Sequence, residues 1–139
     1  MTEPLSPLAD ALARVGDRWT LLVVAALLDG PRRFGELTAD VPGIAPNVLA
    51  GRLRRLEQDG LVVARAYSER PRRFVYELTA SGRELAGALR LLAHWAAPDA
   101  DYGEAPRHAA CGTALEARWY CPTCGHAVDD GETSDLPLV

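Results

Sequence analysis

The feature that most constrains the fold lies between residues 46 and 79, where a helical pattern is followed at once by two strand patterns. Pro46 opens the helix and Gly60 ends it, because proline suits the first helical turn and glycine suits the position after a helix. The runs 61–67 and 74–79 are rich in β-branched and aromatic residues, and a polar, arginine-rich loop joins them. The sequence therefore predicts a helix that leads directly into a β-hairpin.

Three shorter helical patterns precede this unit. Ser6 is predicted to be the N-cap of the first helix, with Pro7 at its first position. Asp17 can cap a second helix that ends at Gly30. The second segment is apolar on nearly every side, which is typical of a buried central helix. The run 32–41 predicts a short third helix.

A last, longer helix is predicted after the second strand, from Thr79 or Ser81 to residue 97. Its apolar positions recur at spacings of four and three, at Leu85, Leu89, Leu92 and Trp95. Three helices, a fourth helix and a hairpin, in this order, are typical of a winged helix-turn-helix. The predicted fold class is therefore α+β, with a winged helix-turn-helix domain over residues 1–97.

Charge is distributed unevenly along the chain. The whole sequence has a formal net charge of −4, yet residues 32–73 hold nine arginines and five acidic residues, a net charge of +4. A polyanion responds to the local field more than to the net charge, so the basic middle favours DNA as a partner. No apolar run approaches the roughly 18 residues of a membrane span, and the N-terminus lacks a signal-peptide pattern. The sequence predicts a cytoplasmic protein without a membrane span.

The helix that begins at Pro46 has one apolar and one polar face. Leu49, Leu53 and Leu56 share the apolar face, which we expect to pack on the core. The polar face and its flanks carry the predicted DNA contacts, which are Asn47, Ala50, Gly51, Arg52, Arg54 and Arg55.

These side chains suit different parts of a duplex. Asn47 can bind adenine and Arg54 can bind guanine through paired hydrogen bonds in the major groove. Arg52 and Arg55 are better placed for phosphates, and the small residues between them permit close approach to the bases. The helix is therefore predicted to be the recognition helix.

The predicted hairpin adds a second basic surface. Its loop and second strand carry Arg70, Arg72 and Arg73, which we expect to contact the DNA backbone, with one of them able to enter the minor groove. Two other interpretations of these residues stay open. The helix can be an ordinary solvated surface helix, or the protein can be an interaction adaptor that keeps the fold without binding DNA, which the net negative charge favours.

A family resemblance rests on three stretches: GDRWTLLVVAALLDGPRRFGEL, VPGIAPNVLAGRLRRLEQDGLVVARAY and VYELTASGRELAGAL. Together they resemble the HxlR-type branch of winged-helix bacterial transcription regulators, related to the MarR group, over residues 6–97. The resemblance implies a transcription regulator, not an enzyme, and a homodimer held by the first and last helices on a palindromic operator. We expect a repressor, because a dimer on its operator blocks polymerase without further contacts.

The resemblance is incomplete at one position. Many members carry a cysteine before the proline of the first helix and sense oxidants or aldehydes through it, whereas this chain has Ser6. Serine has no accessible thiolate, so that mechanism is not expected here. If a small-molecule effector exists, its pocket is expected around Trp19 and Trp95, although both side chains also suit a core.

All three cysteines lie in two similar motifs near the C-terminus, H-x-x-C-G and C-x-x-C-G. Zinc binds four nitrogen or sulfur ligands in a tetrahedron, and a glycine after each second ligand allows the tight turn that such a site needs. The sequence predicts a structural Zn²⁺ site. Its ligands are predicted to be His108, Cys111, Cys121 and Cys124.

The motifs define a small zinc-ribbon-like module over residues 107–128, after a linker at 98–106 and before a flexible tail at 129–139. A segment of about 20 residues cannot bury a core of its own, so the metal would supply its folding energy. We expect one hairpin between the motifs, with Trp119 and Tyr120 packed on it. Bracing of the dimer or contact with a partner protein fits this acidic module best.

Other interpretations of the cysteines stay open. Cys121 and Cys124 can form a redox-responsive dithiol, and oxidation can release a bound zinc. His126 can replace His108 as a ligand. A catalytic zinc would need a general base, and Glu116 is the only acid between the motifs, so an enzyme is not expected.

Overall fold

The computed structural model describes residues 6–96 and 107–133. The predicted linker at 98–106 and residues 134–139 of the predicted tail lie outside the described residues. The chain forms two compact units, with the boundary between Leu89 and Arg90. The first unit contains the predicted recognition helix and hairpin, and the second contains the cysteine motifs.

The first unit begins with four helices and one very short strand. They are α1 (Pro7–Val15), α2 (Arg18–Leu28), β1 (Arg32–Arg33), α3 (Phe34–Asp40) and α4 (Pro46–Gln58). Both predicted N-caps are confirmed. The Ser6 hydroxyl accepts a hydrogen bond of 3.1 Å from the Ala9 amide. The Asp17 carboxylate accepts hydrogen bonds from the Trp19 and Thr20 amides, which have no partner inside the helix.

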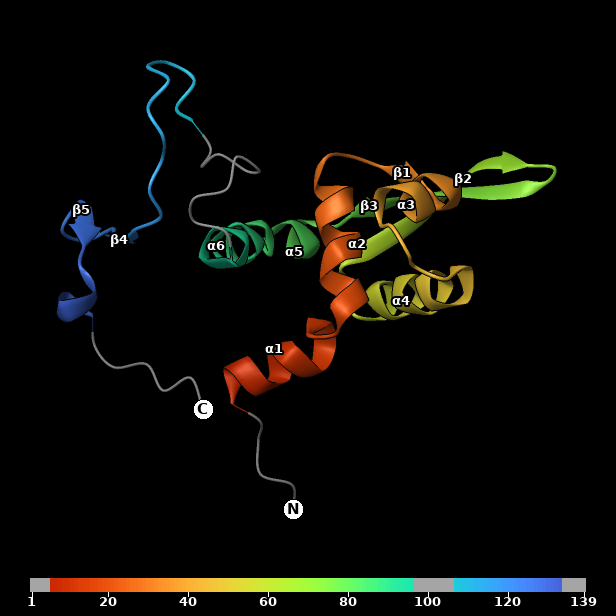
Figure 1. The fold of residues 1–139 in the computed structure, drawn as a ribbon, viewed down its shortest axis with the longest axis horizontal. Helices are drawn as coiled ribbons and strands as arrows, with labels where there is room; N and C mark the ends of the chain where they lie inside the picture. The colour runs from red at the N-terminus through yellow and green to blue at the C-terminus, as the bar shows by residue number, and fades with distance from the viewer. Residues whose placement is uncertain (1–5, 97–106, 134–139) are drawn as a thin grey trace. The chain divides into compact units, whose positions relative to one another are not determined.

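A three-stranded antiparallel sheet follows, in the order β1-β3-β2. β2 (Val62–Glu69) and β3 (Arg72–Leu78) form the predicted hairpin, with Ala64 opposite Tyr76. The hairpin projects beyond the helices, as the wing of a winged helix does (Figure 1). The predicted α+β winged-helix fold is therefore confirmed.

The sequence does not predict strand β1. It indicates a helix from residue 32, whereas Arg32 and Arg33 pair with Tyr76 and Val75 of β3 and the helix begins at Phe34. Two residues have no periodicity of their own, and the partner that makes them a strand comes from a distant part of the chain. The pairing holds the start of α3 against the base of the wing.

The core of this unit lies between α2, α4 and the sheet. The predicted inward face of α4 is confirmed, because Leu49, Leu53 and Leu56 are almost fully buried. Other members of the same buried cluster are Val23, Val24, Leu27, Leu37, Leu61, Val62 and Leu78. Because the leucine face of α4 is used in packing, the opposite face points away from the core.

The last helix is interrupted, whereas the sequence predicts one long helix. The structure has a single turn α5 (Ala80–Arg83), a break at Glu84 and Leu85, and then α6 (Ala86–Ala96). The amides of Glu84 and Leu85 make only long hydrogen bonds of 3.3 Å. The apolar spacing continues across the break, so periodicity alone does not reveal it. No helix within residues 6–96 and 107–133 is long and apolar enough to cross a bilayer.

The second unit contains short elements around the two cysteine motifs. They are an isolated antiparallel bridge between Arg107 and Ala114, the strands β4 (Trp119–Cys121) and β5 (His126–Val128), and the 3-10 helix η1 (Asp130–Glu132). The prediction of one hairpin between the motifs is wrong, because each motif forms the turn of its own antiparallel pair. Trp119 and Tyr120 are exposed instead of packed.

Gly82 provides a test of how the interrupted helix packs on the sheet. It is buried, and an added Cβ would lie 2.2 Å from the carbonyl oxygen of Leu61. We predict that Gly82→Ala lowers the free energy of unfolding by about 1–3 kcal/mol, because the backbone must move. At Gly51 in α4 a Cβ would meet no atom within 4 Å. Gly51→Ala should raise that free energy by about 0.5–1 kcal/mol, since alanine favours a helix interior.

Urea unfolding of both variants, followed by circular dichroism, measures the two effects. Equal effects of the two substitutions would contradict the steric role assigned to Gly82.

Candidate nucleic-acid interface

The outer face of α4 is the surface that the sequence predicts for contact with bases. Asn47 and Arg54 are exposed on it, and Ala50 and Gly51 are half-buried. The space above Gly51 is open, because a Cβ there would meet no atom within 4 Å. This face therefore combines two exposed hydrogen-bonding side chains with small residues that leave open space between them.

Three neighbouring arginines of α4 have different environments. Arg52 Nε lies 2.9 Å from Asp17 Oδ1, and Arg55 Nη2 donates a hydrogen bond of 2.6 Å to the carbonyl of Ala13. Arg54 is exposed and has no ion pair among the residues that the structure describes. In the free protein Arg52 and Arg55, which the sequence assigns to phosphates, therefore fasten α4 to the first two helices.

Asp17 connects the cap of α2 with α4. Its carboxylate accepts hydrogen bonds from the Trp19 and Thr20 amides, from the Thr20 hydroxyl and from Arg52. Partial burial alone would raise the pKa of Asp17, but the hydrogen bonds of Thr20 and Arg52, with the two amides, outweigh burial and lower the pKa to about 2. The carboxylate therefore remains ionised over the whole neutral range.

The predicted wing arginines, Arg70, Arg72 and Arg73, are all exposed at the outer end of the hairpin. None of them has a carboxylate partner within the described parts of the chain. The guanidinium of Arg72 lies over the ring of Phe74, with its Cζ 5.3 Å from the ring centroid. The wing thus offers exposed positive charge in the same compact unit as Arg54.

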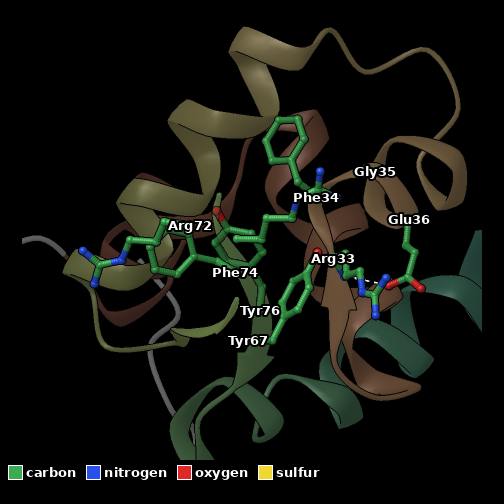
Figure 2. Close-up of a pocket in the computed structure, with 9 residues that line it drawn as sticks. Arg33, Phe34, Gly35, Glu36, Tyr67, Arg72, Phe74 and Tyr76 are labelled. Carbon is green, nitrogen blue, oxygen red and sulfur yellow. Dashed lines mark hydrogen bonds between the residues drawn. The ribbon is translucent and has the colours of Figure 1, made fainter. Parts of the chain in front are cut away.

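A cavity of about 600 Å³ lies beside the wing, between the hairpin and the junction of β1 and α3 (Figure 2). Its lining residues are Arg33, Phe34, Gly35, Glu36, Tyr67, Arg72, Arg73, Phe74 and Tyr76. The sequence predicts any effector pocket around Trp19 and Trp95 and does not indicate this cavity, because one wall of the cavity depends on the unpredicted strand β1. The side chain of Trp95 is 81% exposed.

Tyr76 belongs both to this cavity and to the edge of the core. Burial, and to a smaller extent the charge of Glu57, raise the pKa of Tyr76. Its hydroxyl is therefore protonated at neutral pH and can donate a hydrogen bond.

The two cysteine motifs form closely similar turns. Gly112 and Gly125 have φ values of 72° and 76°, in the region that favours glycine. The amide of each glycine donates a hydrogen bond of 2.8 Å to the carbonyl of the first residue of its motif, His108 or Cys121. The glycines thus allow the tight turns that the sequence predicts at these positions.

Each motif holds its two predicted ligands close together. His108 Nδ1 lies 3.3 Å from Cys111 Sγ, and the Cys124 amide lies 3.4 Å from Cys121 Sγ. No group of three potential metal ligands converges within residues 6–96 and 107–133, so the structure shows two pairs and does not unite all four side chains. The hydrogen bonds that Cys111 makes with the hydroxyl and the amide of Thr113 lower the pKa of Cys111, and the hydrogen bonds that Cys121 makes with Cys124 lower the pKa of Cys121.

Comparison with known proteins identifies the family. The pattern of the HxlR-like helix-turn-helix family matches residues 14–103, which include α2, α4 and the wing. The chain belongs to this family. The resemblance noted in the sequence is thereby confirmed.

Three relatives illustrate the match. The uncharacterised HTH-type transcriptional regulator Rv3095 of Mycobacterium tuberculosis strain H37Rv is 38% identical over 122 residues, covering 85% of this chain and 77% of that protein. The structure of reduced YodB from Bacillus subtilis has a TM-score of 0.58 and 33% identity, over 70% of this chain and 97% of that one. The structure of a putative MarR-family regulator from Porphyromonas gingivalis W83 has a TM-score of 0.65 and 26% identity. The match covers 72% of this chain and 98% of that one.

These comparisons establish the general function. The protein is a DNA-binding transcriptional regulator of the HxlR and MarR type, and its family and relatives are regulators, not enzymes. YodB has been solved in reduced, diamide-treated and quinone-bound forms. The residues of this HxlR-family chain that contact DNA, and its metal site, remain predictions.

The ion pair between Asp17 and Arg52 predicts a specific pH dependence. We expect Asp17→Asn to keep the cap of α2, since asparagine also caps helices, but to lose the ion pair. Because folding lowers the pKa of Asp17, the ionised form stabilises the protein above about pH 4, and this contribution is lost as the pH falls towards 2. The Asp17 side chain is 36% exposed, so solvent screening reduces the expected contribution to about 1 kcal/mol.

Urea unfolding of the wild type and of Asp17→Asn at about pH 7 and about pH 2 checks this expectation. The variant should be less stable at neutral pH, and most of the difference should disappear in acid. A difference of the same size at both pH values would refute the assignment.

Proposed function

We propose that this HxlR-family protein is a homodimeric repressor that binds a palindromic operator through α4 and the wing. The observation that carries the proposal is the division of α4 into a buried leucine face and an outer face with exposed Asn47 and Arg54. Such a helix suits the major groove, because one side packs on its own domain and the other side presents hydrogen-bonding groups to base edges.

The arginines of α4 are proposed to have separate roles. Arg54 has no partner among the described residues, and we assign it to a guanine base, with Asn47 on an adenine. Arg52 and Arg55 are assigned to positioning α4, because both are already engaged with α1 and the start of α2. The phosphate contacts that the sequence predicts for these two residues stay a prediction beside this positioning role.

The wing arginines Arg70, Arg72 and Arg73 are assigned to the DNA backbone. Exposed, unpaired guanidinium groups gain most from neutralising phosphates, since binding releases the counterions condensed on DNA. Ala50 and Gly51 are assigned to close approach, which the open space above Gly51 supports.

The proposed homodimer rests on exposed apolar side chains of α1 and of α6. Leu12 is 57% exposed, Leu92 is 52% exposed and Trp95 is 81% exposed, and Leu8 and Leu91 are also exposed. Exposed apolar side chains along a helix are suited to an interface with another protein chain. A second copy of this chain is the occupant that a palindromic operator requires, because half-sites are related by the symmetry of the protein.

For the second unit we propose a structural Zn²⁺ held by His108, Cys111, Cys121 and Cys124. The equivalence of the two turns supports it, since His108 corresponds to Cys121 and Cys111 to Cys124. The 3.3 Å between His108 Nδ1 and Cys111 Sγ is close to the roughly 3.5 Å expected between two ligands of a tetrahedral zinc. Bound zinc would join the two turns and supply folding energy that so small a unit cannot obtain from a core.

Relatedness also supports a role for this unit. The match to Rv3095 covers 85% of this chain, so it necessarily extends past residue 103, where the HxlR-like match ends. At least part of the extension is therefore shared with a relative. We assign it a bracing or protein-interaction role, because residues 98–139 hold eight acidic residues and two arginines, which disfavours a second DNA contact.

DNA binding by Arg54→Ala and Arg72→Ala tests the proposed interface. On a duplex selected by this protein from a random pool, Arg54→Ala should cost about 1–3 kcal/mol and relax the preference at one base position. Arg72→Ala should weaken binding to all sequences alike and make the salt dependence shallower by about one charge. Fluorescence anisotropy at a series of salt concentrations measures both.

The matched control is Arg83→Ala, which also removes one exposed arginine but lies on α5, outside both proposed surfaces. It should bind DNA as the wild type does. Wild-type binding by all three variants would favour an interaction adaptor, and identical losses in all three would show only a general charge effect.

The zinc proposal predicts one zinc per chain by elemental analysis of the purified protein. Cys121→Ser should remove the metal, whereas His126→Ala should retain it. His126 occupies the position in its turn that Thr113 occupies in the other, and its Nδ1 donates a hydrogen bond of 2.8 Å to the Ala127 carbonyl. A metal-free protein whose Cys121 and Cys124 form a reversible disulfide would instead support the redox-responsive alternative.

A further inference from the structure

We infer that a groove in the second unit binds a basic segment of a partner protein, one that presents a large apolar side chain beside a lysine or arginine. The groove lies at the open end of the β4–β5 hairpin, where the chain enters β4 and leaves β5. The inference rests on the protein-interaction role proposed for this unit and gives that role a surface and a partner chemistry. It does not depend on the proposed DNA contacts.

Most of the groove is formed by two short stretches of chain, residues 116–119 and residues 128–130. Antiparallel pairing brings them together, because Trp119 lies opposite Val128 in the first pair of the β4–β5 ladder. The groove has a volume of about 380 Å³, near the lower end of the range of about 300–1,000 Å³ that is usual for ligand pockets. This size suits the side chains of a short segment of another protein.

Apolar surface in the groove comes from Trp119, Val128 and Ala117. The Trp119 side chain is 70% exposed, whereas Val128 beside it is half-buried. Tryptophan is enriched in the centre of protein interfaces, because a partner can bury a large ring that has little conformational freedom to lose. Trp119 is therefore the side chain of this unit best suited to anchor a partner.

Negative charge dominates the polar part of the lining. Three carboxylates, those of Glu116, Asp129 and Asp130, line the groove together with the single guanidinium of Arg118. One guanidinium neutralises only one of three carboxylates, so the lining keeps a net negative charge. Asp130 forms no ion pair among the residues that the structure describes. A cation of a partner would therefore be attracted to the groove, and Asp130 is the carboxylate best placed to receive it.

Arg118 connects the two stretches that form the groove. Its Nη2 donates a hydrogen bond of 2.8 Å to Oε2 of Glu116, which precedes β4, and its Nη1 lies 3.4 Å from Oδ1 of Asp129, which follows β5. Exposed ion pairs of this kind contribute little to stability. They do join the two sides of the groove before a partner arrives, and a preformed surface loses less freedom when it binds.

These features together select the occupant. The carboxylates repel nucleic acid, and a second copy that turned its own groove towards this one would bring the same carboxylates together, since a symmetric contact joins identical patches. A lysine or arginine of a partner protein can lie over the Trp119 ring and pair with Asp130. A neighbouring apolar side chain can cover the remaining apolar surface, so a basic segment with an apolar anchor fits both parts of the lining.

The test uses a library of random peptides displayed on phage as the probe and the full zinc-supplied chain as the target. We expect the enriched peptides to share a large apolar residue beside a lysine or arginine. A labelled synthetic copy of the most enriched peptide is then titrated with the protein, and binding is measured by fluorescence anisotropy. Binding should weaken as the salt concentration rises, because charge attraction contributes to it.

Two variants and two matched controls locate the bound peptide. Trp119→Ala should weaken binding by about tenfold or more, and Asp130→Asn by about threefold or more. Tyr120→Ala removes an exposed aromatic ring of the same strand, but successive side chains of a strand point to opposite faces, so it should bind as the wild type does. Glu84→Gln removes an exposed carboxylate of the first unit and should also leave binding unchanged.

The groove is rejected if no peptide is enriched, if the enriched peptides carry no basic residue, or if Trp119→Ala and Asp130→Asn bind the peptide as the wild type does. DNA binding and zinc content are measured on the same preparations, which separates this result from the proposed function. Peptide binding that depends on Trp119 and Asp130, in a protein that binds no DNA, would uphold the groove and reject the proposed operator contacts alone. DNA binding without any peptide binding would reject the groove alone.

Discussion

The contacts of Asp17 are the constraint on which the DNA-binding unit depends. Its carboxylate caps α2 and forms an ion pair with Arg52 of α4. The central helix and the proposed recognition helix are therefore connected by this ion pair as well as by the leucine core. The hydrogen bond from Arg55 to Ala13 extends this connection to α1. The helix proposed to read DNA is thus fastened to a helix proposed to form the dimer.

Burial of leucines and an ion pair both position α4, and they differ in the energy that they contribute. Burial of its three leucines gives the larger energy, since each buried leucine contributes about 1.5–3 kcal/mol. The ion pair contributes less because it is partly solvated, but it fixes the rotation of α4 at one end. The result is a helix whose inner face is defined by the core and whose outer face exposes Arg54. Specific binding needs this rigidity, because a base-reading side chain must approach its base edge in a fixed geometry.

Much of the fold could be predicted because its signals are local. The caps at Ser6 and Asp17, the proline that opens α4 and the leucine spacing on its inner face all act within one helix. The features that the sequence does not predict lack such local signals. Strand β1 needs its partner in β3, and the break before α6 does not appear in the apolar spacing. The outer face of α4 was predicted, but the partners of Arg52 and Arg55 lie in other helices, and the wing cavity depends on β1. The four metal ligands remain a prediction, because the structure shows them as two separate pairs.

The central claim is that two copies of this chain place α4 and the wing on one duplex. The most direct test is to select duplexes from a random pool, and then to footprint the complex and measure its mass. The account predicts a palindromic consensus with half-sites about one helical turn, roughly 10 base pairs, apart, and a complex of two chains per duplex. Enrichment of no sequence, or a complex of one chain with a single protected stretch, would contradict it.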